Sequence, residues 1–213
     1  MTNADMILDL YDLHEKTDRS VILPNLNLAI QIGKSAGKAV DRYKGLPELT
    51  NRSKYTVMQW FQREWVKIPV RDLSIIAEYL GFNVYTFYMQ LEKSTVEEFY
   101  EHDKAANEAH GTDCTHIFNK AVKLQYEGDK NIVLDNLAQY WEDPKRLSRE
   151  DSGRRYKDIL ACTGCTRSAY FAWFARSRVD DHIPLIPLCK ISNFVGVDVI
   201  YLMEHEVDKK NSK

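Results

Sequence analysis

The chain has 213 residues, of which 44% are hydrophobic and 28% charged, with nine glycines, six prolines and a formal net charge of -2. This composition excludes a disordered class and predicts a globular protein of one or two domains. No apolar run approaches the roughly 20 residues that a membrane-spanning helix needs, and the acidic N-terminus lacks a secretion-signal pattern, so an intracellular protein without membrane contact is expected.

The sequence contains an internal repeat. A shift of 113 positions lays residues 35–63 on residues 148–176 without a gap, and the identical residues are Ser35, Arg42, Tyr43, Lys44, Thr50, Trp60, Phe61 and Arg63. A shift of 115 extends the match over residues 68–84, and a shift of 111 extends it back over residues 13–26. The chain is therefore predicted to be a tandem duplication of a unit of about 100 residues. The predicted domains are residues 1–93 and 115–207, with an acidic helical connector at 94–114 and a basic tail at 208–213.

Helical spacing of apolar residues appears first at residues 5–15. Residues 26–32 give a second apolar stripe, which Gly33 is expected to end, and residues 35–46 are expected to form the next helix. A turn is predicted at residues 50–53, because Asn51 tolerates a left-handed backbone better than other non-glycine residues.

Residues 54–63 are predicted to form a helix with Ser53 as its N-cap and with Val57, Trp60 and Phe61 facing inward. Pro69 is expected in the first turn of a further helix that reaches Leu80 and stops at Gly81. Residues 84–91 are expected to close the first copy.

Ser94 and Glu97 have capping-box spacing, which predicts that the connector helix begins there and runs toward residues 110–111. In the second copy, helices are expected over residues 117–126 and 132–141. Gly164 then supplies a tight turn and Thr166 an N-cap, and Tyr170, Trp173 and Phe174 face inward.

The charges are unevenly distributed along the chain. Residues 34–71 carry nine basic against three acidic residues, and residues 145–178 again carry nine against three. Residues 92–113, which include most of the connector, carry seven acidic residues against two basic ones. Two basic zones separated by an acidic spacer are typical of nucleic-acid binding, although ordinary solvated helix faces give the same pattern.

The outward residues of the two capped helices are the predicted DNA contacts. Lys54 and Arg63 suit phosphates, Gln59 an adenine edge, and Arg167 a guanine edge. Tyr55 and Thr56 suit the DNA backbone or a thymine methyl group. The full predicted set is Arg52, Ser53, Lys54, Tyr55, Thr56, Gln59, Arg63, Thr166, Arg167, Ser168, Ala169, Ala172 and Arg176.

Residues 160–203 resemble the lambda-repressor-like helix-turn-helix proteins related to Cro and the phage repressors. The resemblance is carried by Thr-Gly at 163–164, Thr-Arg-Ser at 166–168, Ile-Pro-Leu at 183–185, Leu-Cys-Lys-Ile at 188–191 and the stretch 195–203. The first copy matches more loosely over residues 46–91. The resemblance implies an all-α protein with two tandem five-helix helix-turn-helix domains. It also implies a sequence-specific regulator of transcription, repressor-like and of phage or mobile-element origin, that binds double-stranded DNA in the cytoplasm at the nucleoid.

The sequence also bears on metal binding, catalysis and protein partners. Cys162 and Cys165 have the spacing of zinc ligands, but the first copy has Leu49 and Arg52 at the equivalent positions, so core thiols without metal are expected. Catalytic triads and glycine-rich phosphate loops are not found in the sequence, so neither enzymatic activity nor a cofactor is expected. Apolar residues such as Met58 and Phe171 on the outward faces leave open a helical adaptor or inhibitor that binds a protein partner. The resemblance also leaves open a homodimer, because members of that family usually dimerise to match two half-sites.

Overall fold

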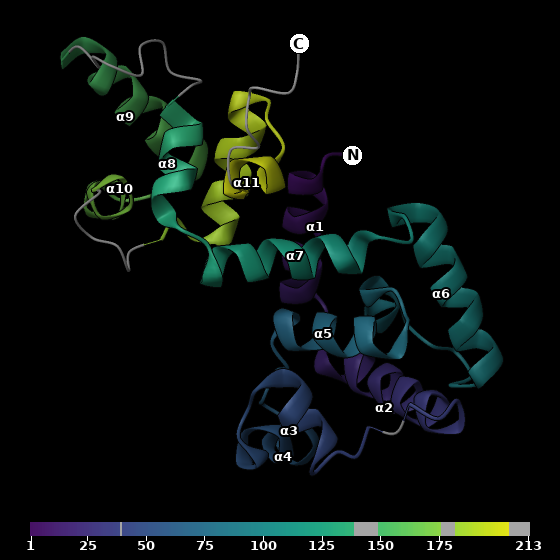
Figure 1. Ribbon diagram of the computed structural model, residues 1–213. Coiled ribbons are helices and arrows are strands. Elements are labelled where there is room, and N and C mark those ends of the chain that lie inside the picture. The colour runs from purple at the N-terminus through teal and green to yellow at the C-terminus, as the bar shows by residue number, and fades with distance from the viewer. Residues whose placement is uncertain (39, 139–148, 176–181, 205–213) are drawn as a thin grey trace, which may run out of the picture. The chain divides into compact units, whose positions relative to one another are not determined.

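The computed structural model describes residues 1–38, 40–138, 149–175 and 182–204, with the backbone alone at 149–154. Every regular element in these ranges is helical and none is a strand, so the fold class is all-α (Figure 1). The helices are α1 (Asn3–Lys16), α2 (Arg19–Ser35), α3 (Gly45–Thr50), α4 (Lys54–Gln62), α5 (Val70–Leu80), the 3-10 helix η1 (Val84–Tyr88), α6 (Val96–His110), α7 (Cys114–Glu127), α8 (Lys130–Ala138), α9 (Arg149–Thr163), α10 (Arg167–Phe174), α11 (Leu185–Val195) and α12 (Val199–Met203). The predicted basic tail at 208–213 lies outside the described residues.

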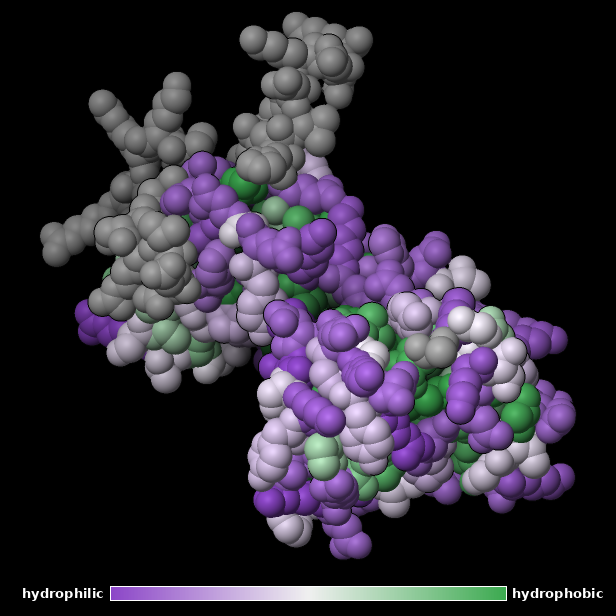
Figure 2. Space-filling model, turned by 60° about the horizontal axis from the view of Figure 1, so that its bottom comes forward, coloured by the Kyte–Doolittle hydropathy of each residue, from purple (hydrophilic) through white to green (hydrophobic). Residues whose placement is uncertain are grey.

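None of the helices in these ranges is both long enough and apolar enough to cross a bilayer. Figure 2 shows that hydrophilic residues cover most of the displayed face, with hydrophobic residues in smaller groups between them.

The chain forms two compact units. The first unit is Asp9–Asn119, and the second unit combines Met1–Leu8 with Lys120–Lys213. Helices α1 and α7 therefore each contribute residues to both units. These divisions do not coincide with the predicted domain boundaries at 93/94 and 114/115.

Helix α6, which the sequence predicted to be a connector, packs inside the first unit against α2 and η1. Phe99 is fully buried, and its ring meets Phe82 edge-on at 5.0 Å between centroids. Burial of an aromatic ring is a large apolar contribution to stability. The acidic residues of α6 therefore lie on an element with its own place in the core.

The prediction of one helix over residues 35–46 was wrong, since α2 ends at Ser35 and α3 begins at Gly45. Helix α2 continues through Gly33 to Ser35. Gly33 allows a close approach there, since a Cβ at this residue would lie 2.5 Å from Leu80 Cδ2. Gly37 then takes a positive φ of 79°. Asp41 Oδ1 accepts hydrogen bonds from the backbone N–H groups of Tyr43 and Lys44, at 2.7 and 3.0 Å. This local bonding competes with the helical pattern and delays the next helix to Gly45.

Two further predicted ends were also displaced. Thr95, not Ser94, is the N-cap of α6, since its side chain accepts from the Glu98 N–H while Ser94 has a φ of 52°. The closing element of the first copy is the short η1, which ends at Tyr88 instead of residue 91.

The predicted stop at Gly81 was confirmed, since Gly81 ends α5 with a left-handed φ of 84°. Pro69 was predicted within the first turn of this helix and lies one residue earlier, as its N-cap. Pro184 and Gly196 do the same for α11. A restricted proline at the start and a glycine at the end are expected of a helix.

Buried polar contacts recur at equivalent positions of the two units. The Asn25 Nδ2 group donates to the carbonyls of Phe87 and Met89, while Asn136, shifted by 111, donates to the carbonyls of residues 202 and 204, shifted by 115. Arg19 donates to the Trp60 carbonyl near the end of α4, and its equivalent Lys130 donates to two carbonyls at the end of α10. Cations at helix C-termini are favourable there. Such recurrence is what a duplicated unit predicts.

Candidate nucleic-acid interface

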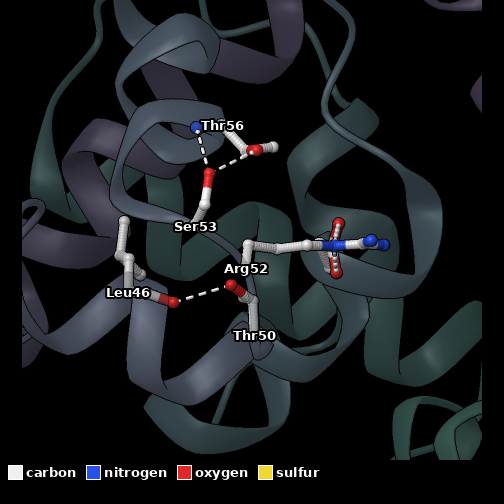
Figure 3. Close-up of polar contacts among 6 residues, drawn as sticks. Leu46, Thr50, Arg52, Ser53 and Thr56 are labelled. Carbon is white, nitrogen blue, oxygen red and sulfur yellow. Dashed lines mark hydrogen bonds and ion pairs between the residues drawn. The ribbon is translucent and has the colours of Figure 1, made fainter.

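In the first unit a tight turn separates α3 from α4 (Figure 3). Thr50 Oγ1 donates back to the Leu46 carbonyl at 2.7 Å, and Asn51 adopts the predicted left-handed conformation at φ 54°. Ser53 Oγ accepts the Thr56 N–H at 3.0 Å, which confirms the predicted N-cap. A capped N-terminus leaves free backbone N–H groups and a positive helix-dipole end beside exposed side chains.

Most of the predicted contacts of the first unit are exposed on or beside α4. Ser53, Lys54, Tyr55, Thr56 and Arg63 are exposed, whereas Gln59 is half-buried. The opposite face of α4 holds the core, since Val57 and Trp60 are buried. Burial of Val57 and Trp60 thus determines which face of α4 is exposed to solvent.

Arg52 differs from what the sequence predicted. Its Nε lies 3.2 and 3.0 Å from the two carboxylate oxygens of Asp72, whose side chain is fully buried while that of Arg52 is 37% exposed. Burial raises the pKa of Asp72, and the hydrogen bonds and charge of Arg52 offset this only in part. Arg52 therefore forms an intramolecular ion pair that joins the turn before α4 to α5. Its charge is neutralised by a carboxylate just past the basic zone counted at residues 34–71.

Exposed aromatic rings alternate with cations around α4. The Lys54 Nζ lies 5.9 Å from the Tyr43 ring centroid, and the Arg63 guanidinium lies 5.4 Å from that of Trp65. Arg63 Nη2 also approaches the Tyr55 hydroxyl at 3.5 Å. Trp65 is 78% exposed. Cation–π contacts hold long cationic side chains in place, so these pairs fix where the positive charges point.

Sequence reasoning missed three residues of this surface, namely Arg42, Tyr43 and Trp65. A signal existed for the first two, because Arg-Tyr-Lys at 42–44 recurs at 155–157. The Arg42 guanidinium lies 4.7 Å from the Phe61 ring, and the equivalent Arg155 lies 5.1 Å from Phe174. The same cation–π contact therefore covers both half-buried phenylalanines. Trp65 carries no comparable signal.

In the second unit α10 is capped as predicted, with Thr166 Oγ1 accepting the Ala169 N–H at 3.2 Å. Thr166, Arg167 and Ser168 are exposed, whereas Ala169 and Ala172 are half-buried. Tyr170 and Trp173 are buried on the core face. Arg176 lies outside the described residues.

The two apolar residues predicted on the outward faces differ from each other. Phe171 is 53% exposed; its ring lies 6.0 Å from that of Tyr156 and 5.5 Å from the Arg167 guanidinium. Met58, its equivalent in α4, is half-buried, so it was wrongly grouped with the exposed residues.

The four cysteines are free thiols. Cys114 and Cys189 are buried, and burial raises the pKa of Cys189 to about 12. Cys162 Sγ donates to the Ile159 carbonyl at 3.5 Å, and burial raises its pKa as well. Within the described ranges, His, Cys, Asp and Glu residues form no group of three or more that is placed to hold a metal ion.

Comparison of the chain with protein-family models, with curated proteins and with solved structures gave no match.

Proposed function

We propose that this protein binds double-stranded DNA sequence-specifically and regulates transcription, with α4 and α10 as the elements that enter the major groove. The observation that carries the proposal is the geometry of α4. A turn and an N-cap fix its start, one face is buried, and the other presents Lys54, Tyr55 and Thr56 to solvent. An α-helix with an exposed polar N-terminal half fits the width of the major groove.

Exposed cations of the first unit support contacts with phosphate. Between residues 34 and 63 they are Lys34, Lys38, Arg42, Lys44, Lys54 and Arg63. Arg42 and Arg63 are held by aromatic rings, which reduces the conformational entropy that binding would remove. In such a complex cations around a groove-bound helix position the protein on the backbone, while Thr56 and Gln59 contact base edges.

For the second unit, Arg167 is the proposed reader of a guanine, because its planar guanidinium matches two acceptors at once. Thr166 and Ser168 flank it on the exposed start of α10. The repressor-like role and the phage or mobile-element origin rest on the resemblance of residues 160–203 alone.

Selection from a random duplex pool at low salt, followed by a salt titration, tests the proposal. Binding through six phosphates is expected to give a slope of about -5 in log K against log salt, which is a loss of roughly a thousandfold between 50 and 200 mM. Recovery of one motif identifies a single reading helix, and a pair of half-sites identifies both. If no duplex is retained at low salt, the proposal is wrong.

A helical adaptor that binds a protein is the second candidate, favoured by the exposure of Trp65 and Phe171. Aromatic residues in such positions are common centres of protein interfaces. This candidate predicts a partner whose affinity changes little over the same salt range and falls on Trp65→Ala or Phe171→Ala.

A further inference from the structure

The two units divide the chain at equivalent positions of the repeat. The division between Leu8 and Asp9 becomes, after a shift of 111, the division between Asn119 and Lys120. The start of α1, from the first repeat, therefore belongs to the second unit, and the start of α7, from the second repeat, belongs to the first unit. We call residues 1–8 and 112–119 the exchanged segments.

The first exchanged segment is anchored in the second unit by side chains of α1. Asn3 Nδ2 donates to Asp198 Oδ2 at 2.8 Å, and Asn193 Nδ2 donates to Asp5 Oδ1 at 2.7 Å. Ala4 and Ile7 are buried beside them, Ile7 completely. We call Asn193 and Asp198 the receiving pair of the second unit.

The other exchanged segment makes the matching contacts in the first unit. Cys114 Sγ donates to Asn83 Oδ1 at 3.1 Å, and His116 Nδ1 lies 2.8 Å from Glu78 Oε1. Phe118 is completely buried, as is its equivalent Ile7. Glu78 and Asn83 are the receiving pair of the first unit.

The four residues that make the contacts in the second unit are equivalent, under the repeat, to the four that make them in the first unit. A shift of 111 converts Asn3 and Asp5 into Cys114 and His116, and a shift of 115 converts Glu78 and Asn83 into Asn193 and Asp198. The contacts are thus the same pair of contacts, made twice with different chemistry.

The chemistry selects the exchanged pairing. His116 Nδ1 lies at hydrogen-bonding distance from a Glu78 carboxylate oxygen, whereas the Asp5 carboxylate accepts a hydrogen bond from the Asn193 amide. If each segment packed on its own repeat, Asp5 would face Glu78. Two carboxylates at hydrogen-bonding distance repel each other. Repulsive alternatives are a general source of pairing specificity.

We propose that the receiving pair of each unit is a binding site for a helical segment, and that its cognate partner is the exchanged segment of the opposite repeat in the same chain. The exchange ties the repeats together as subunits of a helix-exchanged dimer are tied, with the difference between His116 and Asp5 specifying which segment each unit accepts. This role is independent of DNA binding.

A charge substitution with rescue tests the pairing in the full chain. Asn193→Glu places a carboxylate opposite Asp5 and is expected to lower the urea midpoint of unfolding, while Asn193→Gln, the amide control, changes it less. Adding Asp5→His to Asn193→Glu recreates the chemistry of the other unit. This double variant is expected to recover at least half of the loss. No recovery, or an equal loss in the glutamine control, contradicts the assigned contact.

Cleavage of the folded protein tests the exchange itself. Gly111 and Thr112 are both exposed, so a protease site can be inserted between them. Cleavage at this site after folding breaks the only peptide link between the two repeats. The two fragments are expected to co-elute in a 1:1 complex whose dissociation constant rises at least tenfold with Asn193→Glu and returns with Asp5→His. The proposal is wrong if the fragments separate without denaturant, or if neither substitution changes the dissociation constant of their complex. So does an uncut chain that is dimeric and becomes monomeric with Asn193→Glu, because the segment would then come from a second copy.

Discussion

Arg52 and Asp72 form an ion pair in which the carboxylate is fully buried and the guanidinium reaches the surface. The pair joins the turn before α4 to α5, so it sets the position of the helix start that carries Ser53 and Lys54. The second copy has Cys165 and Pro187 at the equivalent positions and forms no such pair. The start of α10 is therefore held by other means.

Arg52→Ala is expected to destabilise the protein by about 3 kcal/mol, because it leaves a buried carboxylate without its partner. The double variant Arg52→Met/Asp72→Leu, which removes both charges, is expected to lose less. Loss of Arg52 also raises the pKa of Asp72 further, so the penalty should shrink as the pH falls through that pKa and the group becomes neutral. Urea unfolding at several pH values measures both effects. Equal losses in the single and double variants would contradict this account.

Lys54→Ala and Arg63→Ala are each expected to weaken DNA binding on all sequences and to reduce the magnitude of the salt slope by about 1. Lys104→Ala is the matched control, since Lys104 is an exposed lysine on the acidic α6. Arg167→Ala should instead relax the preference at one base position. Titration of the selected duplex and of a scrambled one separates these outcomes. If Lys104→Ala weakens binding as much as Lys54→Ala does, α4 is not the DNA contact.

Ser53→Ala and Thr166→Ala are each expected to cost about 1 kcal/mol, since each removes the N-cap of its helix. Ser53→Asp keeps a capping oxygen and is expected to retain stability, yet its negative charge should weaken DNA binding. This variant separates the capping role of Ser53 from its proposed place in the interface. Thermal unfolding and DNA titration of the same samples provide the measurement.

His14 makes the stability depend on pH. Burial, helped by the positive charge of Lys67, lowers the pKa of His14 to about 4, and its Nδ1 lies 3.1 Å from the Tyr88 hydroxyl. The folded state therefore holds the neutral ring, while the unfolded state takes up a proton below its ordinary pKa near 6.5. Stability is complete above that pH and falls as the pH drops from about 6.5 toward 4, by up to about 3 kcal/mol.

His14→Gln should flatten this part of the pH profile, because it removes the buried imidazole that must stay neutral in the folded state. Urea midpoints from pH 4 to pH 7 measure the difference. A wild-type profile that is unchanged by His14→Gln would rule out this histidine as the cause.

Much of the fold was predictable wherever a signal is local. Ser53, Thr166 and Asn51 behave as predicted because a cap or a left-handed turn is decided by residues within about four positions. Exposure of the two helix faces followed equally from apolar spacing. The predicted helix at 35–46 failed because Asp41 binds the backbone N–H groups of Tyr43 and Lys44, and this local bonding competes with helical spacing.

The sequence by itself determined the all-helical class, the internal repeat and the two capped helices with their exposed residues. Only the tertiary structure decided that Arg52 is bound to Asp72, that α6 belongs to the core of the first unit, and that residues 1–8 pack in the second unit. The physical reason is range. Caps and turns depend on neighbours in the chain, whereas a buried ion pair or an exchanged helix depends on which distant surfaces meet. Similar local patterns in the two copies are compatible with either pairing.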